Sequence, residues 1–124
     1  MLPHPPISQN VLQFIGDELP SPNQPEALRK TLMLIMLAWN YSIYPVESKE
    51  SQVINNDILR MPNKKRIEFE KHLTFWVEKK KRLFPNDRRI IVDLDLKKRG
   101  GGYSLVASSY DYDNPRKNEP ARNS

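Results

Sequence analysis

The chain of 124 residues contains no cysteine. Disulfide bonds, thiolate metal ligands and a thiol nucleophile are therefore excluded, and a reducing compartment is favoured. The longest apolar stretch, residues 32–39, falls well short of the about 20 residues that a helix needs to cross a bilayer. The first residues also lack the basic and apolar segments of a secretory signal. We therefore expect a cytoplasmic protein without a membrane partner.

Histidine and glycine are scarce, with two and four residues. His72 follows Glu68 at a spacing that places both on one helix face, but two ligands are too few for a metal site. The glycines at 100–102 do not precede a predicted helix, so they do not form a nucleotide-binding loop. No Ser-His-Asp pattern is present. We predict no catalytic residue, no metal and no cofactor, and hence a protein that is not an enzyme.

One acidic pattern leaves a weak enzymatic alternative open. The segment Asp93–Lys97 ends in Asp-x-Lys with Asp87 upstream, an arrangement similar to that of metal-dependent nucleases. Those nucleases usually place the acidic elements on different strands, whereas here they follow one another in one run. The plainer interpretation is a solvated strand face, on which the carboxylates lie beside Arg89 and Lys97.

Proline is abundant but unevenly placed, with six of the 11 prolines in the first 25 residues. This concentration predicts an extended proline-rich arm over residues 1–7. Residues 8–110 are predicted to form a single domain, which is long enough to fold without disulfides or metals. The polar composition of residues 111–124 predicts a disordered tail.

Apolar residues at helical spacing predict four helices, at about 9–19, 25–44, 49–60 and 63–84. Ser8 is the expected N-cap of the first, and Pro25 suits the first position of the second. The second helix is apolar nearly all round, which favours a central place in the core, or a core position combined with a contact to a second copy. The fourth has an apolar stripe and an opposite charged face on which Phe75 stands out.

After Pro85 the apolar period changes from helical to alternating. Residues 88–97 predict a half-buried strand with Ile90, Val92, Leu94 and Leu96 on one face. Residues 103–109 predict a second strand, and the glycines between the two predict a hairpin. The predicted fold class is therefore α+β, a small helical domain of about four helices followed by a C-terminal β-hairpin.

The hairpin register can be predicted from the apolar pattern. A loop of Gly100 and Gly101 places Leu96 opposite Leu105 and Leu94 opposite Ala107. A loop of all three glycines would place Leu96 opposite Val106 and Leu94 opposite a serine. We favour the first register because it keeps the apolar face dry.

The net charge of +5 is concentrated in one region. Residues 60–99 contain fourteen basic and six acidic side chains. Such an excess favours a polyanion partner, because phosphate binding releases counterions. We predict a small, non-catalytic accessory protein that contacts nucleic acid through a basic helix and a basic hairpin tip. The candidate contacts are Lys64, Lys71, Lys79, Arg82, Arg88, Lys97, Lys98 and Arg99.

The second, third and fourth predicted helices followed by a basic-tipped hairpin resemble the order of winged-helix DNA-binding domains, with the second helix as scaffold. The resemblance lies in the layout and not in a residue motif. It implies that the third and fourth predicted helices form a helix-turn-helix and that the hairpin is the wing.

A second hypothesis needs no nucleic acid. The chain would then be a protein–protein interaction module, such as an adaptor, an inhibitor or an immunity-type protein, with an acidic protein as its partner. Exposed aromatic side chains are frequent anchors in protein interfaces. The candidates are Phe75, Tyr103 and Tyr110, and a homodimer is possible.

Overall fold

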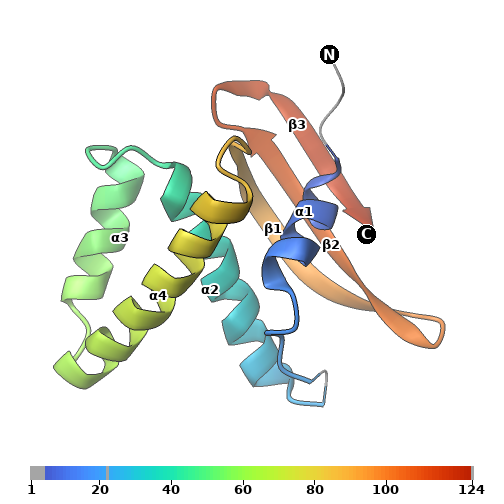
Figure 1. Cartoon of the computed structure of the whole chain (residues 1–124), viewed down its shortest axis with the longest axis horizontal. Helices are drawn as coiled ribbons and strands as arrows, with labels where there is room; N and C mark the ends of the chain where they lie inside the picture. The colour runs from blue at the N-terminus through green and yellow to red at the C-terminus, as the bar shows by residue number, and fades with distance from the viewer. Residues whose placement is uncertain (1–4, 22, 124) are drawn as a thin grey trace.

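Four helices precede a β-hairpin, as the sequence predicted, and the α+β fold class is confirmed. A third strand, which was not predicted, extends the hairpin into a three-stranded antiparallel sheet. The structure is a computed structural model that describes residues 5–21 and 23–123, without the side chains of Arg99 and residues 117–123. In Figure 1, α1 lies in front of the sheet, α2 and α4 lie beside it, and α3 is outermost. The elements are α1 (Ile7–Ile15), α2 (Pro25–Ile43), α3 (Lys49–Leu59), α4 (Asn63–Leu83), β1 (Arg89–Arg99), β2 (Gly102–Asp111) and β3 (Asn114–Asn123).

The helix ends follow local chemistry. Pro25 occupies the first turn of α2, where its missing N–H costs nothing. Ser48 caps α3, its hydroxyl accepting a hydrogen bond from the backbone N–H of Ser51 at 3.2 Å. The prediction for α1 was wrong at its end: the helix stops at Ile15 rather than at Pro20. The cause is Gly16, whose φ of 60° leaves helical geometry in a region open to glycine.

The core is built around α2, as its nearly all-round apolar pattern predicted. Ile35, Ala38 and Trp39 of this helix are fully buried. The ring of Phe14 from α1 meets Trp39 and Trp76 edge-on, with ring centroids 5.3 and 5.1 Å apart. These aromatic contacts join α1, α2 and α4 into one core.

The predicted hairpin register is confirmed: Leu96 pairs with Leu105 and Leu94 with Ala107. The predicted strand faces are wrong at one point. A β-bulge between Ile91 and Asp93 adds a residue to β1, so that Ile91 is 2% exposed and Val92 60% exposed. A bulge shifts the alternation of side chains by one residue, which strict period-two counting does not anticipate.

Both predicted terminal segments differ from the structure. Residues 114–123 form β3 against β2 instead of a disordered tail, because backbone hydrogen bonds to a neighbouring strand do not require apolar side chains. Residues 1–4 of the predicted arm lie outside the described residues. The arm is tied down at its end, since the carbonyl of Pro5 accepts a hydrogen bond from Arg89 at 2.7 Å and Ile7 is fully buried.

Candidate binding surfaces

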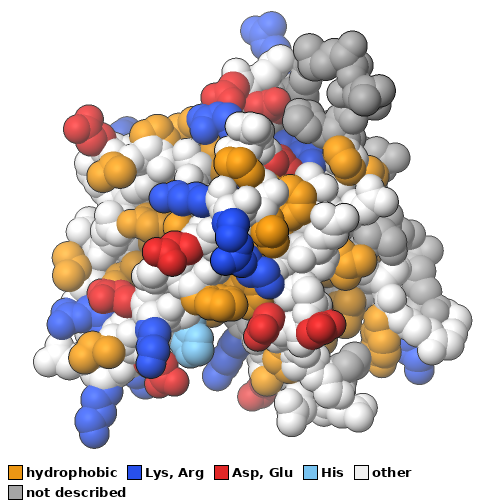
Figure 2. Space-filling view, viewed as in Figure 1, with side chains coloured by type: hydrophobic (Ala, Val, Ile, Leu, Met, Phe, Trp, Pro, Cys, Tyr) orange, Lys and Arg blue, Asp and Glu red, His pale blue; other side chains and the backbone are white. Residues whose placement is uncertain are grey.

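The exposed face of α4 carries half of the predicted nucleic-acid contacts. Lys64, Lys71 and Arg82 are exposed, and helical spacing places them in one row. No ion pair involves these three side chains among the described residues. Carboxylates interrupt the row, however, and Figure 2 shows acidic and basic side chains interleaved over the visible face. We call this row, with Glu68, Phe75, Glu78 and Lys79, the α4 outer face.

Phe75 lies in the middle of the α4 outer face and is 49% exposed. Its ring packs edge-on against Trp76 at a centroid distance of 5.2 Å. The ammonium of Lys79 lies 5.2 Å from the Trp76 ring centroid and 6.0 Å from that of Phe75. Lys79 is therefore partly engaged in a cation–π contact, whereas Phe75 retains an exposed apolar side.

The hairpin tip carries the second group of predicted contacts. Lys97 and Lys98 are exposed, but neighbouring residues of a strand point to opposite faces. The side chain of Arg99 lies outside the described part of the chain. Tyr103, the cross-strand partner of Lys98, is 52% exposed. The tip therefore presents its two described lysines to different sides.

Tyr110, a predicted protein-interaction residue, is half-buried rather than exposed. It packs at the margin of the core, close to the phenol of Tyr44. Burial, together with Tyr110, raises the pKa of Tyr44 to about 12. Of the three aromatic candidates, Phe75 and Tyr103 are the accessible ones.

The predicted cations do not form one continuous surface. Figure 1 places the hairpin tip at the lower right and the Asn63 end of α4 at the lower left, at opposite ends of the molecule. The tip therefore does not flank α4 as the wing of the winged-helix resemblance would. Arg88 is also engaged elsewhere, since its guanidinium donates hydrogen bonds to Asp113 at 2.5 and 3.2 Å.

A buried ionic cluster joins α1, α4 and β1, and the sequence analysis did not anticipate it. Asp87 accepts hydrogen bonds from Arg89 at 2.8 and 2.9 Å and from Asn10 at 2.8 Å. Burial alone would raise the pKa of Asp87, but these donors hold it below its usual value. Asp87 is thus fully engaged in an ion pair, whereas Asp95 of the nuclease pattern is exposed on β1.

Lys80 belongs to the same cluster. Its ammonium donates hydrogen bonds to the carbonyls of Phe84 and Asp87 at 2.7 and 2.8 Å and lies 4.8 Å from the ring centroid of Trp39. Burial lowers the pKa of Lys80 to about 8, although the charge of Asp87 opposes the shift. The only signal in the sequence was its position beside the apolar stripe of α4.

An open apolar groove of about 580 Å³ runs between α2, α3 and α4. We call it the helical groove. Met33 is 60% exposed in it, and Lys30, Asn40 and Tyr44 are the polar residues of its lining. The sequence indicated a largely apolar α2 but not which elements would complete a groove. Its apolar lining consists of Met33, Leu34, Met36, Leu37, Ile54 and Phe69.

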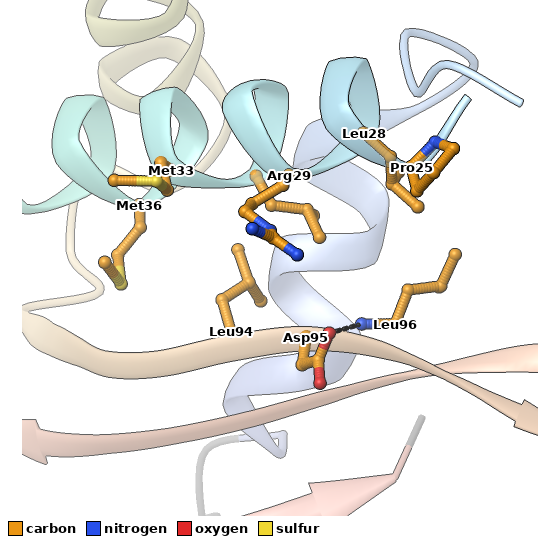
Figure 3. A pocket seen from close by; sticks show the side chains of 9 residues that line it. Pro25, Leu28, Arg29, Met33, Met36, Leu94, Asp95 and Leu96 are labelled. Atoms are coloured by element: carbon orange, nitrogen blue, oxygen red, sulfur yellow. Dashed lines mark hydrogen bonds between the residues drawn. The ribbon is translucent and has the colours of Figure 1, made fainter. Parts of the chain in front are cut away.

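A second groove of about 260 Å³ lies on the other side of α2, between this helix and β1. We call it the edge groove. Figure 3 shows Leu94 and Asp95 facing the side chains of Arg29 and Met36 across the gap. Met33 and Met36 line both grooves, so one ridge of α2 separates the two.

Within residues 5–21 and 23–123, no helix has the length and apolar character required to cross a membrane. The same residues bring together no group of three His, Asp or Glu side chains suited to a metal ion. No family model, no curated protein and no solved structure matches this chain.

Proposed function

We propose that this chain is a non-catalytic protein-binding module, and that the helical groove holds an amphipathic helix of its partner. The observation that carries the proposal is the concentration of accessible apolar side chains in one concave site. Met33 remains 60% exposed beside Leu34 and Leu37. Grooves walled by helices bind the apolar face of a partner helix through side chains spaced by three or four residues.

The chemistry of the lining suggests the character of the partner. Lys30 lines the groove, and the chain as a whole carries a net charge of +5. An amphipathic helix with acidic residues beside its apolar face would complement both features. Methionine side chains in the lining can adapt to the shape of such a helix.

The test uses synthetic helical peptides of equal apolar pattern, one set with acidic and one with basic flanking residues. We expect the acidic set to bind and to shift the methyl resonances of Leu37 and Ile54, which line the helical groove and not the edge groove. Met33→Glu should abolish this binding. Val46→Glu, at a site 85% exposed and outside the groove, is the control. The proposal would be overturned if the Met33→Glu variant bound the peptides as well as the native protein does, or if neither peptide set bound.

A second candidate function is contact with nucleic acid along the α4 outer face. Lys64, Lys71 and Arg82 in one exposed row support it, and Phe75 offers an aromatic surface on which a base could stack. Binding should weaken with rising salt, because phosphate contacts release counterions.

The separation of α4 from the hairpin tip sharpens this second test. Replacing Lys64, Lys71 and Arg82 together by serine should flatten the salt dependence of binding to duplex and single-stranded probes. The matched variant replaces Lys97 and Lys98, and it should have a smaller effect. Failure of the native protein to bind any probe at low salt would exclude this function.

A further inference from the structure

β1 is an edge strand, and only part of its outer edge is covered. Near its start, the indole of Trp39 donates a hydrogen bond to the carbonyl of Arg89, and the amide of Asn40 pairs with the backbone of Ile91. Toward the hairpin tip, α2 and β1 diverge (Figure 1). The edge groove opens beside Leu94–Leu96 (Figure 3).

The backbone along this open stretch is oriented for pairing with another strand. Arg99 and Gly102 close a two-residue loop, so alternate residues before Arg99 bond to β2. The residues between them, Leu94, Leu96 and Lys98, turn their N–H and C=O groups outward. One contact supports this orientation: the N–H of Leu96 donates to its neighbour Asp95 at 2.8 Å instead of to β2. Exposed edges of this kind readily accept a further strand.

We propose that this edge binds a second copy of the chain, with the two β1 strands antiparallel and Leu96 opposite Leu96 at the two-fold axis. The argument is charge complementarity. In this register each Asp95 lies opposite Lys97 of the second copy, and each Lys97 opposite Asp95. Opposite charges across an antiparallel pair stabilise it. Leu94 and Lys98 then form the flanking hydrogen-bonded pairs.

The neighbouring registers each contain a like-charged pair. Outward-facing residues must pair with outward-facing residues, so the register can change only in steps of two along the strand. One step in one direction places Asp95 opposite Asp95, and one step in the other places Lys97 opposite Lys97. Like charges directly opposite each other destabilise a strand pair. Each neighbouring register thus contains a like-charged pair that the proposed register avoids, although the first of them would also place Asp93 opposite Lys97.

Asp95 changes partner when the two copies pair. In the single chain its carboxylate accepts the N–H of Leu96, which keeps this donor satisfied. In the pair, that N–H donates to the carbonyl of Leu96 in the second copy, and the carboxylate becomes available to Lys97. Because one hydrogen bond replaces another and the paired stretch is short, we expect weak, concentration-dependent association.

The experiment exchanges charges. Asp95→Lys makes positions 95 and 97 both basic, and Lys97→Asp makes them both acidic. Sedimentation of the full chain from micromolar to millimolar concentration should show self-association of the native protein. Each variant alone should associate about tenfold more weakly or worse. An equimolar mixture of the two variants should form a heterodimer, because opposite charges then face each other again.

The controls are Glu47→Lys and Lys49→Asp, which make the same charge changes at exposed positions near the start of α3 and should leave association unchanged. Circular dichroism would verify that all variants fold. A native protein that stays monomeric overturns the proposal, as does a mixture that fails to associate. Association lost in Met33→Glu but kept in both edge variants would place the contact in the helical groove and overturn it too. The outcome of this self-association experiment does not depend on the proposed peptide binding, because peptide binding is measured on the monomeric protein.

Discussion

The side-chain amide of Asn40 pairs with the backbone of Ile91 as a neighbouring strand would. Its oxygen accepts the N–H of Ile91 at 2.8 Å, and its nitrogen donates to the carbonyl of Ile91 at 2.9 Å. A polar residue in the last turn of an apolar helix thus satisfies both backbone groups at the covered part of the β1 edge. This contact fixes α2 against the strand just before the β-bulge, and it marks where the open edge begins.

Asn40→Ala should therefore lower the free energy of unfolding by about 2–4 kcal/mol, because it leaves a buried N–H and a buried carbonyl without partners. Urea denaturation followed by tryptophan fluorescence measures the change. Asn56→Ala, at an exposed position of α3, should change stability by no more than about 0.5 kcal/mol. Equal effects of the two substitutions would contradict this assignment.

The architecture could be predicted from the sequence because the spacing of apolar residues indicates which side of a helix or strand is buried. The nearly all-round apolar pattern of 25–44 predicted that α2 lies in the core. The alternating leucines of β1, together with the glycines that follow it, predicted the hairpin register. The bulge at Val92 and the end of α1 at Gly16 could not be predicted in this way, because they depend on local backbone geometry. β3 was missed for a related reason, since its pairing depends on the backbone and not on apolar side chains.

The candidate surfaces were less predictable than the fold. A count of lysines and arginines cannot tell that Arg88 pairs with Asp113, that Arg89 is buried against Asp87, or that Lys80 points inward. These partners come from elements distant in sequence or from the turn after α4. The helical groove could not be predicted either, because Ile54 and Phe69 come to line it only when three helices pack together.

The ion pair between Asp87 and Arg89 should govern acid stability. The folded pKa of Asp87 lies below its usual value of 3.8, so its contribution is complete above about pH 4 and is lost as the pH falls further. Asp87→Asn leaves the buried guanidinium without its counter-charge and should cost about 3–5 kcal/mol at neutral pH. Its unfolding free energy should also fall less steeply in acid than that of the native protein. A slope unchanged by the substitution would argue against this role.

Lys80 should also make the unfolding free energy rise with pH, but in alkali rather than in acid. Its pKa is about 8 in the folded chain against 10.5 as the ordinary value. Between these two pH values the unfolded chain binds more protons, so the contribution of Lys80 to stability rises with pH. Lys80→Met should lose this rise when unfolding is measured across the window. Lys81→Met, one residue further and exposed, should keep it.

Tyr44 should oppose that rise at higher pH. Its pKa of about 12 exceeds the ordinary value of 10 because the phenol is buried. Between pH 10 and 12 the unfolded chain releases this proton first, so stability should fall with pH. Tyr44→Phe should flatten the fall, whereas Tyr103→Phe, on the exposed hairpin, should not. The phenolate absorbance of the folded protein provides a second readout of the same titration.

Substitution of Gly16 should lower the stability of the fold even though a side chain there would meet no clash. Its φ of 60° is rarely adopted by other residues, and a Cβ there would lie 3.5 Å from the ammonium of Lys79, an ordinary contact. The expected loss of about 1–3 kcal/mol in Gly16→Ala therefore comes from backbone strain and not from a clash. Shortening the neighbour in Gly16→Ala/Lys79→Ala should not restore stability relative to Lys79→Ala alone. Gly101→Ala, at a glycine without positive φ or any neighbour within 4 Å, is the control. A full recovery in the double variant would show that crowding, not conformation, selects glycine at the end of α1.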